Sequence, residues 1–447
     1  MMMFFRTPSR TTTSASAPQS NKGSDWSNWR GPLHNGATVA TNLPTKFTAL
    51  EWSTDLMGPS HATPIVHGKY VFTTVANVKQ GALQVVALDR KTGKVLWADN
   101  LGSGHRSGNE GSVTQLDERS IYAAPSPTTD GKHVWFFFGN GDLGCYTVDG
   151  RKVWTRNIQK ETHDFNFMWT FSSSPLLYKG ILYLQILQRD KIVGRRGKDG
   201  GESYLLAMDP KTGQDLWKAS RPSEASNESR ESYGTPMPYS SGGKDQLLVA
   251  GGDYLSGHDP KNGKELWRWG TWNPGHRELW WRLVPSPVAG DGVVLVCAPK
   301  KAPVYACPTD KQGDISADGL LWKSDDRSNL TSDVATPAFH DGKFFIVSDV
   351  RKSVSCVEAK TGKIVWSTDT PGFNMCWGSP TIADGKLYTT NVGGIVLVYD
   401  IQTGKLLAEN RVDDEGSEVR SSVAIAGNQL FIRTSKRMIC VASPSRK

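Results

Sequence analysis

Residues 87–97 read ALDRKTGKVLW, and variants of this sequence recur along the chain. Further copies, two of them shortened, end at Trp154, Trp217, Trp267, Trp322, Trp366 and Leu407. Counted from Trp97, the steps between these end points are 57, 63, 50, 55, 44 and 41 residues. Four short strands with their turns fit into the shortest step, whereas a strand–helix–strand unit fits it less well. The recurrence therefore predicts a repeat architecture built from strands.

The acidic residue and the Thr-Gly pair of each copy predict a tight turn between two strands. In the first copy the side chains of Asp89 and Thr92 can hold the turn through bonds to the backbone, and Gly93 can adopt a positive φ. The alternating apolar residues after the turn predict the next strand. A tryptophan at one fixed strand position suits packing between neighbouring sheets. Each copy is therefore expected to be a hairpin whose tryptophan contacts the next sheet.

A second element follows each copy and consists of a small residue, a hydroxyl residue and, in all but the last case, proline. The eight hydroxyl residues are Thr63, Ser126, Ser174, Thr235, Ser286, Thr336, Ser379 and Ser422. Strands crowded around a shared axis require small side chains at this point. The two elements together predict an all-β fold, an eight-bladed β-propeller of four-stranded antiparallel blades.

The eight hydroxyl elements are followed by only seven copies of the hairpin motif, so one outer strand is missing at the C-terminal end. Residues 50–56, LEWSTDL, can supply it by pairing with the stretch around Cys440. Such a pairing closes the ring and removes the open edges of the first and last sheets. The single propeller domain is therefore predicted to span residues 50–447. An N-terminal strap is predicted at residues 25–49.

Composition excludes several classes of protein. The 447 residues carry 52 Lys and Arg against 44 Asp and Glu, a net charge of +8, with no run of five basic residues. We therefore expect no nucleic-acid partner. No apolar stretch is long enough for a transmembrane helix. Residues 1–24 contain no acidic residue and no apolar core of a secretory signal, and are predicted to be a disordered or targeting tail. The first cysteine is Cys145, so no lipobox is visible.

The repeated acid-x-x-TGK-x-x-W motif resembles the pyrroloquinoline-quinone (PQQ) repeat propellers. That family includes quinoprotein alcohol dehydrogenases and BamB-like outer-membrane protein assembly factors. The segment DWSNWRGPLHNG at residues 25–36 resembles the lead-in of non-catalytic bacterial members. The resemblance implies a binding or scaffold protein of the periplasm or cell envelope, with a BamB-like role in outer-membrane protein assembly as one version. The alternative is a PQQ-dependent oxidoreductase acting on alcohols or sugars, with PQQ and calcium.

Features of the quinoprotein enzymes cannot be matched in this sequence. The enzymes often carry a vicinal disulfide, and no two cysteines are adjacent here. Their calcium ligands and catalytic aspartate cannot be assigned residue by residue. The histidines and cysteines also lack the spacing of a zinc site. We therefore predict no catalytic residue, no metal ligand and no bound cofactor.

The segments just before the hydroxyl elements are expected to enter one face of the ring near its central channel. The candidate partner-binding residues in them are His61, Tyr122, His163, Trp169, Phe171, Arg230, Glu231, His276, Trp280, Trp281, Arg282, Asp333, Trp377 and Arg420. Aromatic side chains interleaved with arginine are typical of binding surfaces. Tryptophans here also suit filling of the space between blades, and both interpretations stay open. The predicted partner is a protein or a glycan on this loop face, bound by a monomer.

Overall fold

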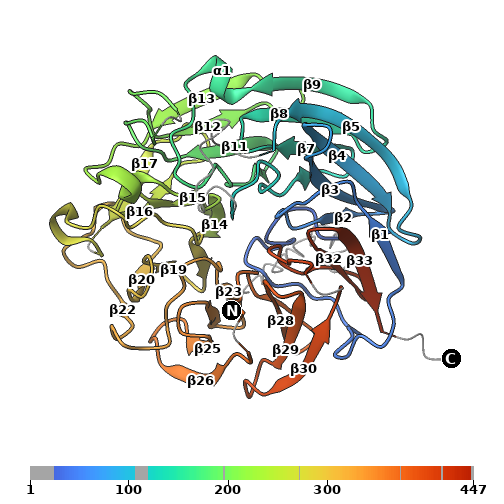
Figure 1. Ribbon diagram of the computed structural model, residues 1–447. Coiled ribbons are helices and arrows are strands. Elements are labelled where there is room, and N and C mark those ends of the chain that lie inside the picture. Colours follow the sequence, from blue (N-terminus) through green and yellow to red (C-terminus); the bar gives the residue numbers. More distant parts are fainter. Residues whose placement is uncertain are drawn as a thin grey trace, which may run out of the picture.

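Eight small sheets stand around one axis as the blades of a propeller (Figure 1). The computed structural model describes residues 25–105, 119–194, 197–270, 272–372, 374–413 and 416–443. Within each blade the chain runs from the innermost strand outward through antiparallel neighbours, except that the outermost strands of blades 4 and 8 come from elsewhere in the chain. The predicted eight-bladed β-propeller is confirmed.

The blades are numbered in chain order, and their strands are given from the axis outward. Blades 1 to 3 contain β2 (Ile65–His67), β3 (Tyr70–Asn77), β4 (Ala82–Asp89) and β5 (Val95–Ser103); β6 (Thr128–Thr129), β7 (His133–Phe137), β8 (Asp142–Thr147) and β9 (Lys152–Asn157); and β10 (Leu176–Tyr178), β11 (Ile181–Ile186), β12 (Tyr204–Met208) and β13 (Asp215–Ser220). Blades 4 and 5 contain β14 (Met237–Ser241), β15 (Lys244–Gly251), β16 (Tyr254–His258), β17 (Glu265–Trp269) and β21 (Gly313–Asp314); and β18 (Val288–Gly290), β19 (Val293–Cys297), β20 (Val304–Pro308) and β22 (Trp322–Lys323). Blades 6 to 8 contain β23 (Ala338–His340), β24 (Lys343–Ser348), β25 (Ser353–Glu358) and β26 (Ile364–Asp369); β27 (Thr381–Ala383), β28 (Lys386–Asn391), β29 (Ile395–Asp400) and β30 (Leu406–Arg411); and β31 (Ala424–Ala426), β32 (Gln429–Arg433), β33 (Arg437–Ala442) and β1 (Trp52–Asp55).

Helical structure in the described residues is confined to single turns. They are the helix α1 (Ile158–Glu161) and the 3₁₀ turns η2 (Asn227–Arg230) and η3 (Pro274–His276). In the part of the chain that the structure describes, no helix has the length and apolarity needed to span a membrane.

The strand β1 closes the ring as the sequence predicts. It pairs antiparallel with β33, with Trp52 opposite Cys440 and Asp55 opposite Arg437. In Figure 1 this strand, at the N-terminal end of the colour range, lies against the C-terminal blade. Because the ring is closed, every blade has a neighbour on both sides. The exposed ends that an open row of sheets would have are therefore absent.

The eight hydroxyl residues form a closed ring of hydrogen bonds around the axis, which we call the hydroxyl ring. Each lies just before the innermost strand of its blade, and its backbone N–H donates to the hydroxyl oxygen of the next blade. The bonds run Thr63→Ser126, Ser126→Ser174, Ser174→Thr235, Thr235→Ser286, Ser286→Thr336, Thr336→Ser379, Ser379→Ser422 and Ser422→Thr63, with N···O distances of 2.8 to 3.0 Å. A hydroxyl residue therefore recurs in every repeat because its oxygen accepts the hydrogen bond that joins neighbouring blades.

The tryptophans that recur in the repeats also join blades, at the outer strands. In six of them the indole Nε1–H donates to a backbone carbonyl in the turn of the next copy. The pairs are Trp52–Arg90, Trp97–Val148, Trp154–Pro210, Trp217–Pro260, Trp322–Ala359 and Trp366–Ile401, at 2.8 to 3.2 Å. The glycine of that turn lies against the indole ring, and a Cβ on Gly93 would lie 2.5 Å from Trp52. The hydroxyl ring therefore joins every blade to its neighbour near the axis, and the tryptophans join six of the eight neighbouring pairs at the outer strands.

Blade 4 departs from the predicted four strands because β21 adds to its edge. Trp267 donates to Gln246 within its own blade (2.7 Å) instead of to the next one. Blade 5 has a shortened hairpin motif, and the longer connection between β20 and β22 supplies β21, which pairs parallel with β17. The fifth strand, β21, thus covers the edge of blade 4 that the shortened motif of blade 5 leaves free.

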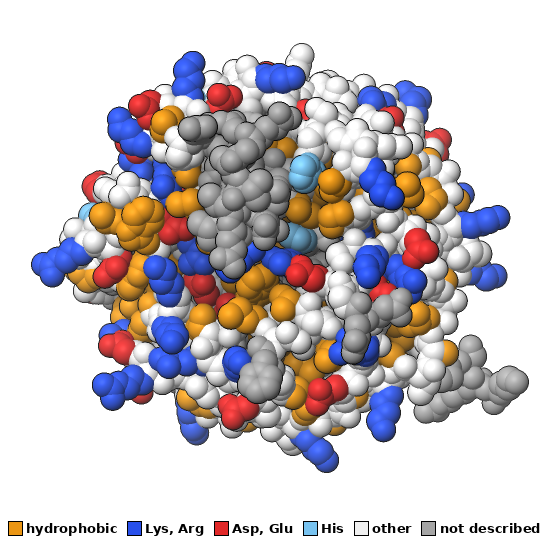
Figure 2. All heavy atoms as spheres, viewed as in Figure 1, with side chains coloured by type: hydrophobic (Ala, Val, Ile, Leu, Met, Phe, Trp, Pro, Cys, Tyr) orange, Lys and Arg blue, Asp and Glu red, His pale blue; other side chains and the backbone are white. Residues whose placement is uncertain are grey.

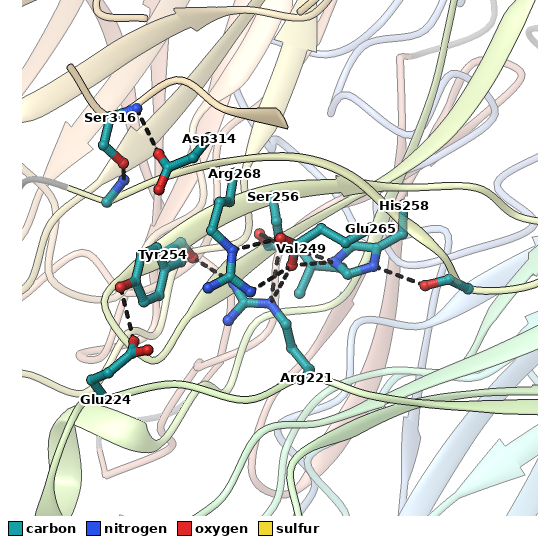
Figure 3. A network of polar contacts seen from close by, with 12 residues as sticks. Arg221, Glu224, Val249, Tyr254, Ser256, His258, Glu265, Arg268, Asp314 and Ser316 are labelled. Carbon is teal, nitrogen blue, oxygen red and sulfur yellow. Dashed lines mark hydrogen bonds and ion pairs between the residues drawn. The ribbon is translucent and has the colours of Figure 1, made fainter. Parts of the chain in front are cut away.

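A polar network stabilises this side of blade 4 (Figure 3). Arg221, just after β13 of blade 3, is buried and donates to Ser256 Oγ at 3.1 Å. The carboxylate of Glu265 lies 2.5 Å from Arg268 and 3.9 Å from Arg221. Burial lowers the pKa of Arg221 to about 10, while the Glu265 carboxylate opposes that shift. The network links blades 3 and 4, in addition to the bond between Trp217 and Pro260.

The N-terminal strap crosses one end of the central channel. Trp26 pairs through its backbone with Val66 of blade 1, at 2.8 and 2.9 Å, and its side chain is fully buried. Farther along, the Arg30 guanidinium donates to the carbonyl oxygens of Pro337 (2.9 Å) and Pro380 (3.1 Å), in blades 6 and 7. The carbonyl of Ser27 also accepts the backbone N–H of Thr129 in blade 2, at 3.0 Å. Because blade 6 lies opposite blade 2 in a ring of eight, the strap spans the channel.

Candidate functional site

A cavity of about 410 Å³ lies on the axis of the propeller. Seven of the eight hydroxyl-ring residues line it, the exception being Ser286. Trp29 of the strap also lines it, and the loops before the innermost strands supply much of the remaining wall. A volume of this size falls in the range of small-molecule sites. In the face shown in Figure 2, hydrophobic, acidic, basic and histidine side chains lie together around the middle of the molecule.

Six of the predicted candidate residues line this cavity. They are His61, Trp169, Arg282, Asp333, Trp377 and Arg420. They come from blades 1, 3, 5, 6, 7 and 8 of the ring, so the fold brings together side chains up to 359 residues apart in the sequence. The prediction that the loops before the hydroxyl elements meet near the channel holds for these six residues.

The other eight candidates lie outside the cavity lining. Phe171 belongs to the hydrophobic core, and Tyr122 and Trp281 are half-buried against it. Three more are held in polar contacts: Arg230 lies 3.4 Å from Asp190, His276 lies 2.8 Å from Asp253, and His163 contacts the carbonyl of Asp199 at 3.0 Å. Glu231 is fully buried behind the wall, and Trp280 is 49% exposed.

An ion pair fixes the charged side chains on one side of the cavity. Arg282 donates from both terminal nitrogens to the two carboxylate oxygens of Asp333, at 2.9 and 2.8 Å. Asp333 Oδ1 also accepts the backbone N–H of Lys300 at 2.6 Å. A bidentate pair of this kind is strong and fixed in orientation. Both oxygens of Asp333 are therefore already engaged.

Two of the three tryptophans of the wall, Trp169 and Trp377, are held differently. The indole N–H of Trp169 donates to Glu228 at 2.9 Å, which fixes the ring. The guanidinium of Arg420 lies 4.9 Å from the centroid of Trp377 and also bonds to Glu418 at 2.9 Å. The Nε1 of Trp377 is buried and has no hydrogen-bond partner among the described residues. Its N–H is therefore a donor that remains available.

Several titratable side chains of the cavity wall have displaced pKa values, and two of them are His61 and Asp349. Burial, with Arg420 and Arg433 nearby, lowers the pKa of His61 to about 3, so its imidazole is neutral at physiological pH. Burial raises the pKa of Asp349 to about 6. The Oδ1 of Asp349 accepts the backbone N–H of Asp333 at 3.0 Å.

A buried carboxylate lies behind the wall, at Glu231. It contacts Arg189 and the hydroxyl of Tyr233, and accepts the backbone N–H of Met168 at 3.0 Å. Burial outweighs these favourable contacts and raises the pKa of Glu231 to about 7. The guanidinium of Arg189 lies 5.9 Å from the ring centroid of Trp280. This chain of contacts connects the inner wall to an exposed aromatic side chain.

Several side chains of the cavity were not among the predicted candidates. Trp29 belongs to the predicted strap and reaches the cavity, whereas Trp26 of the same strap is fully buried. Arg119 and Asp349 also line the cavity. Asp349 follows β24, in the hairpin to β25, and the loops between the second and third strands of the blades were not considered. An acidic residue directly after a buried strand was the available signal.

The side chains of the cavity do not fit a calcium-bound PQQ. Calcium requires six to eight oxygen ligands, usually from several carboxylates. Asp333 is committed to Arg282 and the Lys300 amide, which leaves Asp349 as the other carboxylate of the lining. Among the described residues, no group of three or more His, Cys, Asp or Glu side chains is placed to hold a metal ion.

Comparison with known proteins assigns the family. The family model PQQ_2, described as outer membrane protein assembly factor BamB, matches residues 25–191, 125–315 and 313–446. The chain belongs to this family. The resemblance of its repeats to the PQQ-repeat propellers is thereby confirmed. No curated protein sequence matches the chain significantly.

Solved structures share the fold of this PQQ_2 member at low identity. BamB from Moraxella catarrhalis superposes with a TM-score of 0.60 and 11% identity, covering 88% of this chain and 99% of that one. A europium-containing methanol dehydrogenase gives 0.64 and 12%, covering 92% and 89%. Quinohemoprotein alcohol dehydrogenase from Comamonas testosteroni gives 0.65 and 13%, covering 96% and 82%. BamB and two dehydrogenases thus share this propeller, and the likeness establishes the fold alone.

Proposed function

We propose that this protein is a non-catalytic binding propeller of the cell envelope that contributes to outer-membrane protein assembly. Membership of a family described as outer membrane protein assembly factor supports this role. The wall of the cavity supports it too, because Arg282 and Asp333 neutralise each other in a bidentate pair instead of facing a reacting group. The proposed location is the periplasm or the envelope, and the proposed partner is an unfolded outer-membrane protein.

The exposed side chain of Trp280 carries this proposal. It is 49% exposed on the loop between blades 4 and 5, while Arg189 beneath it lies 5.9 Å from the ring centroid. Arg189 is itself fixed by buried Glu231. Because Arg189 holds the ring of Trp280 in place, this tryptophan loses little conformational entropy when a partner binds. Tryptophans of this kind are common among the residues that contribute most to binding at interfaces. The rim around Trp280 is therefore the proposed partner surface.

Binding of a fluorescently labelled, urea-unfolded outer-membrane β-barrel protein, measured by anisotropy on dilution, tests the proposal. Trp280→Ala should weaken the binding by about tenfold or more, since truncation of a hot-spot residue costs about 2 kcal/mol or more. The control Leu216→Ala removes a side chain of similar exposure (52%) on β13 and should leave the affinity unchanged. Equal affinities of wild type and Trp280→Ala would contradict the proposal.

The second candidate function is a PQQ-dependent oxidoreductase. Its specific support is the superposition on two quinoprotein dehydrogenases over more than 90% of this chain, together with a cavity on the propeller axis. Titration of the purified protein with PQQ and calcium, followed by dye reduction with alcohols or glucose, separates the two candidates. Turnover in this assay would favour the enzyme, and its absence at saturating PQQ and calcium would favour the binding protein.

A further inference from the structure

The hydroxyl ring has unused donors that face the central cavity. Each of its oxygens accepts one backbone N–H, but no hydroxyl of the ring donates to an acceptor among the described residues. All eight residues are buried, and seven of them line the cavity. Each hydroxyl retains one O–H donor and one lone pair. The seven hydroxyls that line the cavity can therefore each make a further hydrogen bond to a group inside it.

Aromatic faces form the rest of the binding surface. Trp29, Trp169 and Trp377 line the same cavity from the strap, blade 3 and blade 7. The ring of Trp169 is fixed through its bond to Glu228, and the buried Nε1–H of Trp377 has no partner in the described part of the chain. The site therefore combines flat apolar surfaces with hydrogen-bonding groups that can both donate and accept. Its occupant must have the same two properties.

The charges around the cavity balance and indicate a neutral occupant. Arg282 pairs with Asp333 and Arg420 with Glu418, while Arg119 and Asp349 add one basic and one acidic side chain to the same lining. Of these, Asp349 is held at Oδ1 by the Asp333 amide and is a further acceptor in the wall. A neutral ligand keeps this balance, whereas an anion or cation would leave a buried net charge.

We propose that the axial cavity binds a neutral sugar, as a free saccharide or as one residue of a glycan. The ring faces of a sugar stack on tryptophan, and its hydroxyl groups donate to and accept from serine and threonine. A volume of about 410 Å³ accommodates a ligand of this size. This inference goes beyond the partner surface at Trp280, which lies outside the cavity lining, so the two can fail separately.

Saturation-transfer difference NMR on the full chain tests the proposal with glucose, galactose, N-acetylglucosamine and maltose as neutral probes. Glucuronate and benzoate are the charged probes, each at about 10 mM, a concentration that detects millimolar affinity. We expect a saturation-transfer signal from at least one neutral sugar. Absence of a signal from all four neutral probes, or signals from the charged probes only, would overturn the proposal.

Two matched serine variants test the location. Ser379→Ala and Ser286→Ala each remove one hydroxyl of the ring and one bond between blades, at 3.0 and 2.8 Å, but only Ser379 lines the cavity. Loss of a hydrogen bond to an uncharged ligand should weaken sugar binding about 3- to 10-fold in Ser379→Ala and leave it unchanged in Ser286→Ala. Equal effects of both variants would place the sugar elsewhere. Trp280→Ala should retain sugar binding, which distinguishes this site from the proposed partner surface.

Discussion

The backbone N–H of Ser422, in the last blade, donates a hydrogen bond of 3.0 Å to the hydroxyl oxygen of Thr63, in the first. The two residues are 359 positions apart. Seven similar bonds connect the remaining blades, so this contact completes a ring with no free end. The propeller is thus closed twice, by hydroxyl residues at its axis and by β1 at its outer edge.

Removing the hydroxyl of Thr63 should destabilise the ring at its closing point. In Thr63→Val the Ser422 N–H stays buried without an acceptor, which should lower the free energy of unfolding by about 1 to 3 kcal/mol. Urea denaturation measures this. The control is Thr73→Val, because the hydroxyl oxygen of Thr73 is buried and has no partner among the described residues. Its replacement should leave stability unchanged or raise it, and equal losses in both variants would rule out a special role of the ring.

Gly93 should be sensitive to substitution because of its contact with the closing strand. Gly93 and Gly81 both have positive φ, 72° and 61°, so alanine costs about 1 to 2 kcal/mol at either position. A Cβ at Gly93 would lie 2.5 Å from Trp52, whereas a Cβ at Gly81 would meet nothing within 4 Å. Gly93→Ala should therefore be less stable than Gly81→Ala by about 1 to 3 kcal/mol. Thermal unfolding compares the two, and identical midpoints would show that Trp52 moves aside freely.

The fold could be predicted because one pattern recurs around the ring. A single copy of the motif around Trp97 is compatible with many hairpins, but the hydroxyl element recurs eight times and the hairpin motif seven. The count also predicted the closing strand at residues 50–56, because one outer strand was missing. The pattern did not predict β21, which pairs with β17 over only two residues. This strand forms because the shortened hairpin motif of blade 5 leaves part of the edge of blade 4 uncovered.

The cavity could be predicted only in part, for a related reason. His61, Arg282 and Trp377 each lie within a few residues before a hydroxyl residue, so the repeat places them near the axis. Trp29 precedes the first repeat, and Asp349 lies in the hairpin between β24 and β25, outside the segments that precede the hydroxyl elements. Their positions follow from the path of the strap and from side-chain packing, which spacing in the sequence does not encode.

The Arg282–Asp333 pair should matter far more to stability than an exposed pair of similar length. Its two side chains are 13% and 14% exposed, against 38% and 47% for Lys218 and Glu202, whose N···O distance is 2.7 Å. Arg282→Met leaves a largely buried carboxylate without its partner, which should cost about 3 to 5 kcal/mol. Lys218→Met should cost less than about 1 kcal/mol.

A double-mutant cycle measures the coupling in each pair by urea denaturation. Arg282→Met combined with Asp333→Leu removes both charges and should recover most of the stability lost in Arg282→Met alone. If the double variant is as unstable as the sum of the single ones, the two side chains are not coupled, and the wall of the cavity is fixed by other contacts.

The buried carboxyl of Glu231 should make stability depend on pH near neutrality. Burial raises its pKa from 4.5 to about 7 in the folded state. Between these values the folded protein holds a proton that the unfolded chain has released, so the free energy of unfolding falls as the pH rises through this window. His61 and His258, whose pKa values are lowered to about 3 and about 4 by burial, contribute the opposite slope.

Comparison with Glu231→Gln isolates this contribution, since the histidine terms are the same in both proteins. Glutamine cannot ionise, so between pH 5 and 7.5 the wild type should lose about 2 kcal/mol more stability than the variant. Chemical denaturation at a series of pH values measures both curves, and Glu409→Gln, at an exposed position, should run parallel to the wild type. Parallel curves for Glu231→Gln would mean that Arg189 keeps Glu231 ionised throughout, because only an unchanged charge produces no difference in slope.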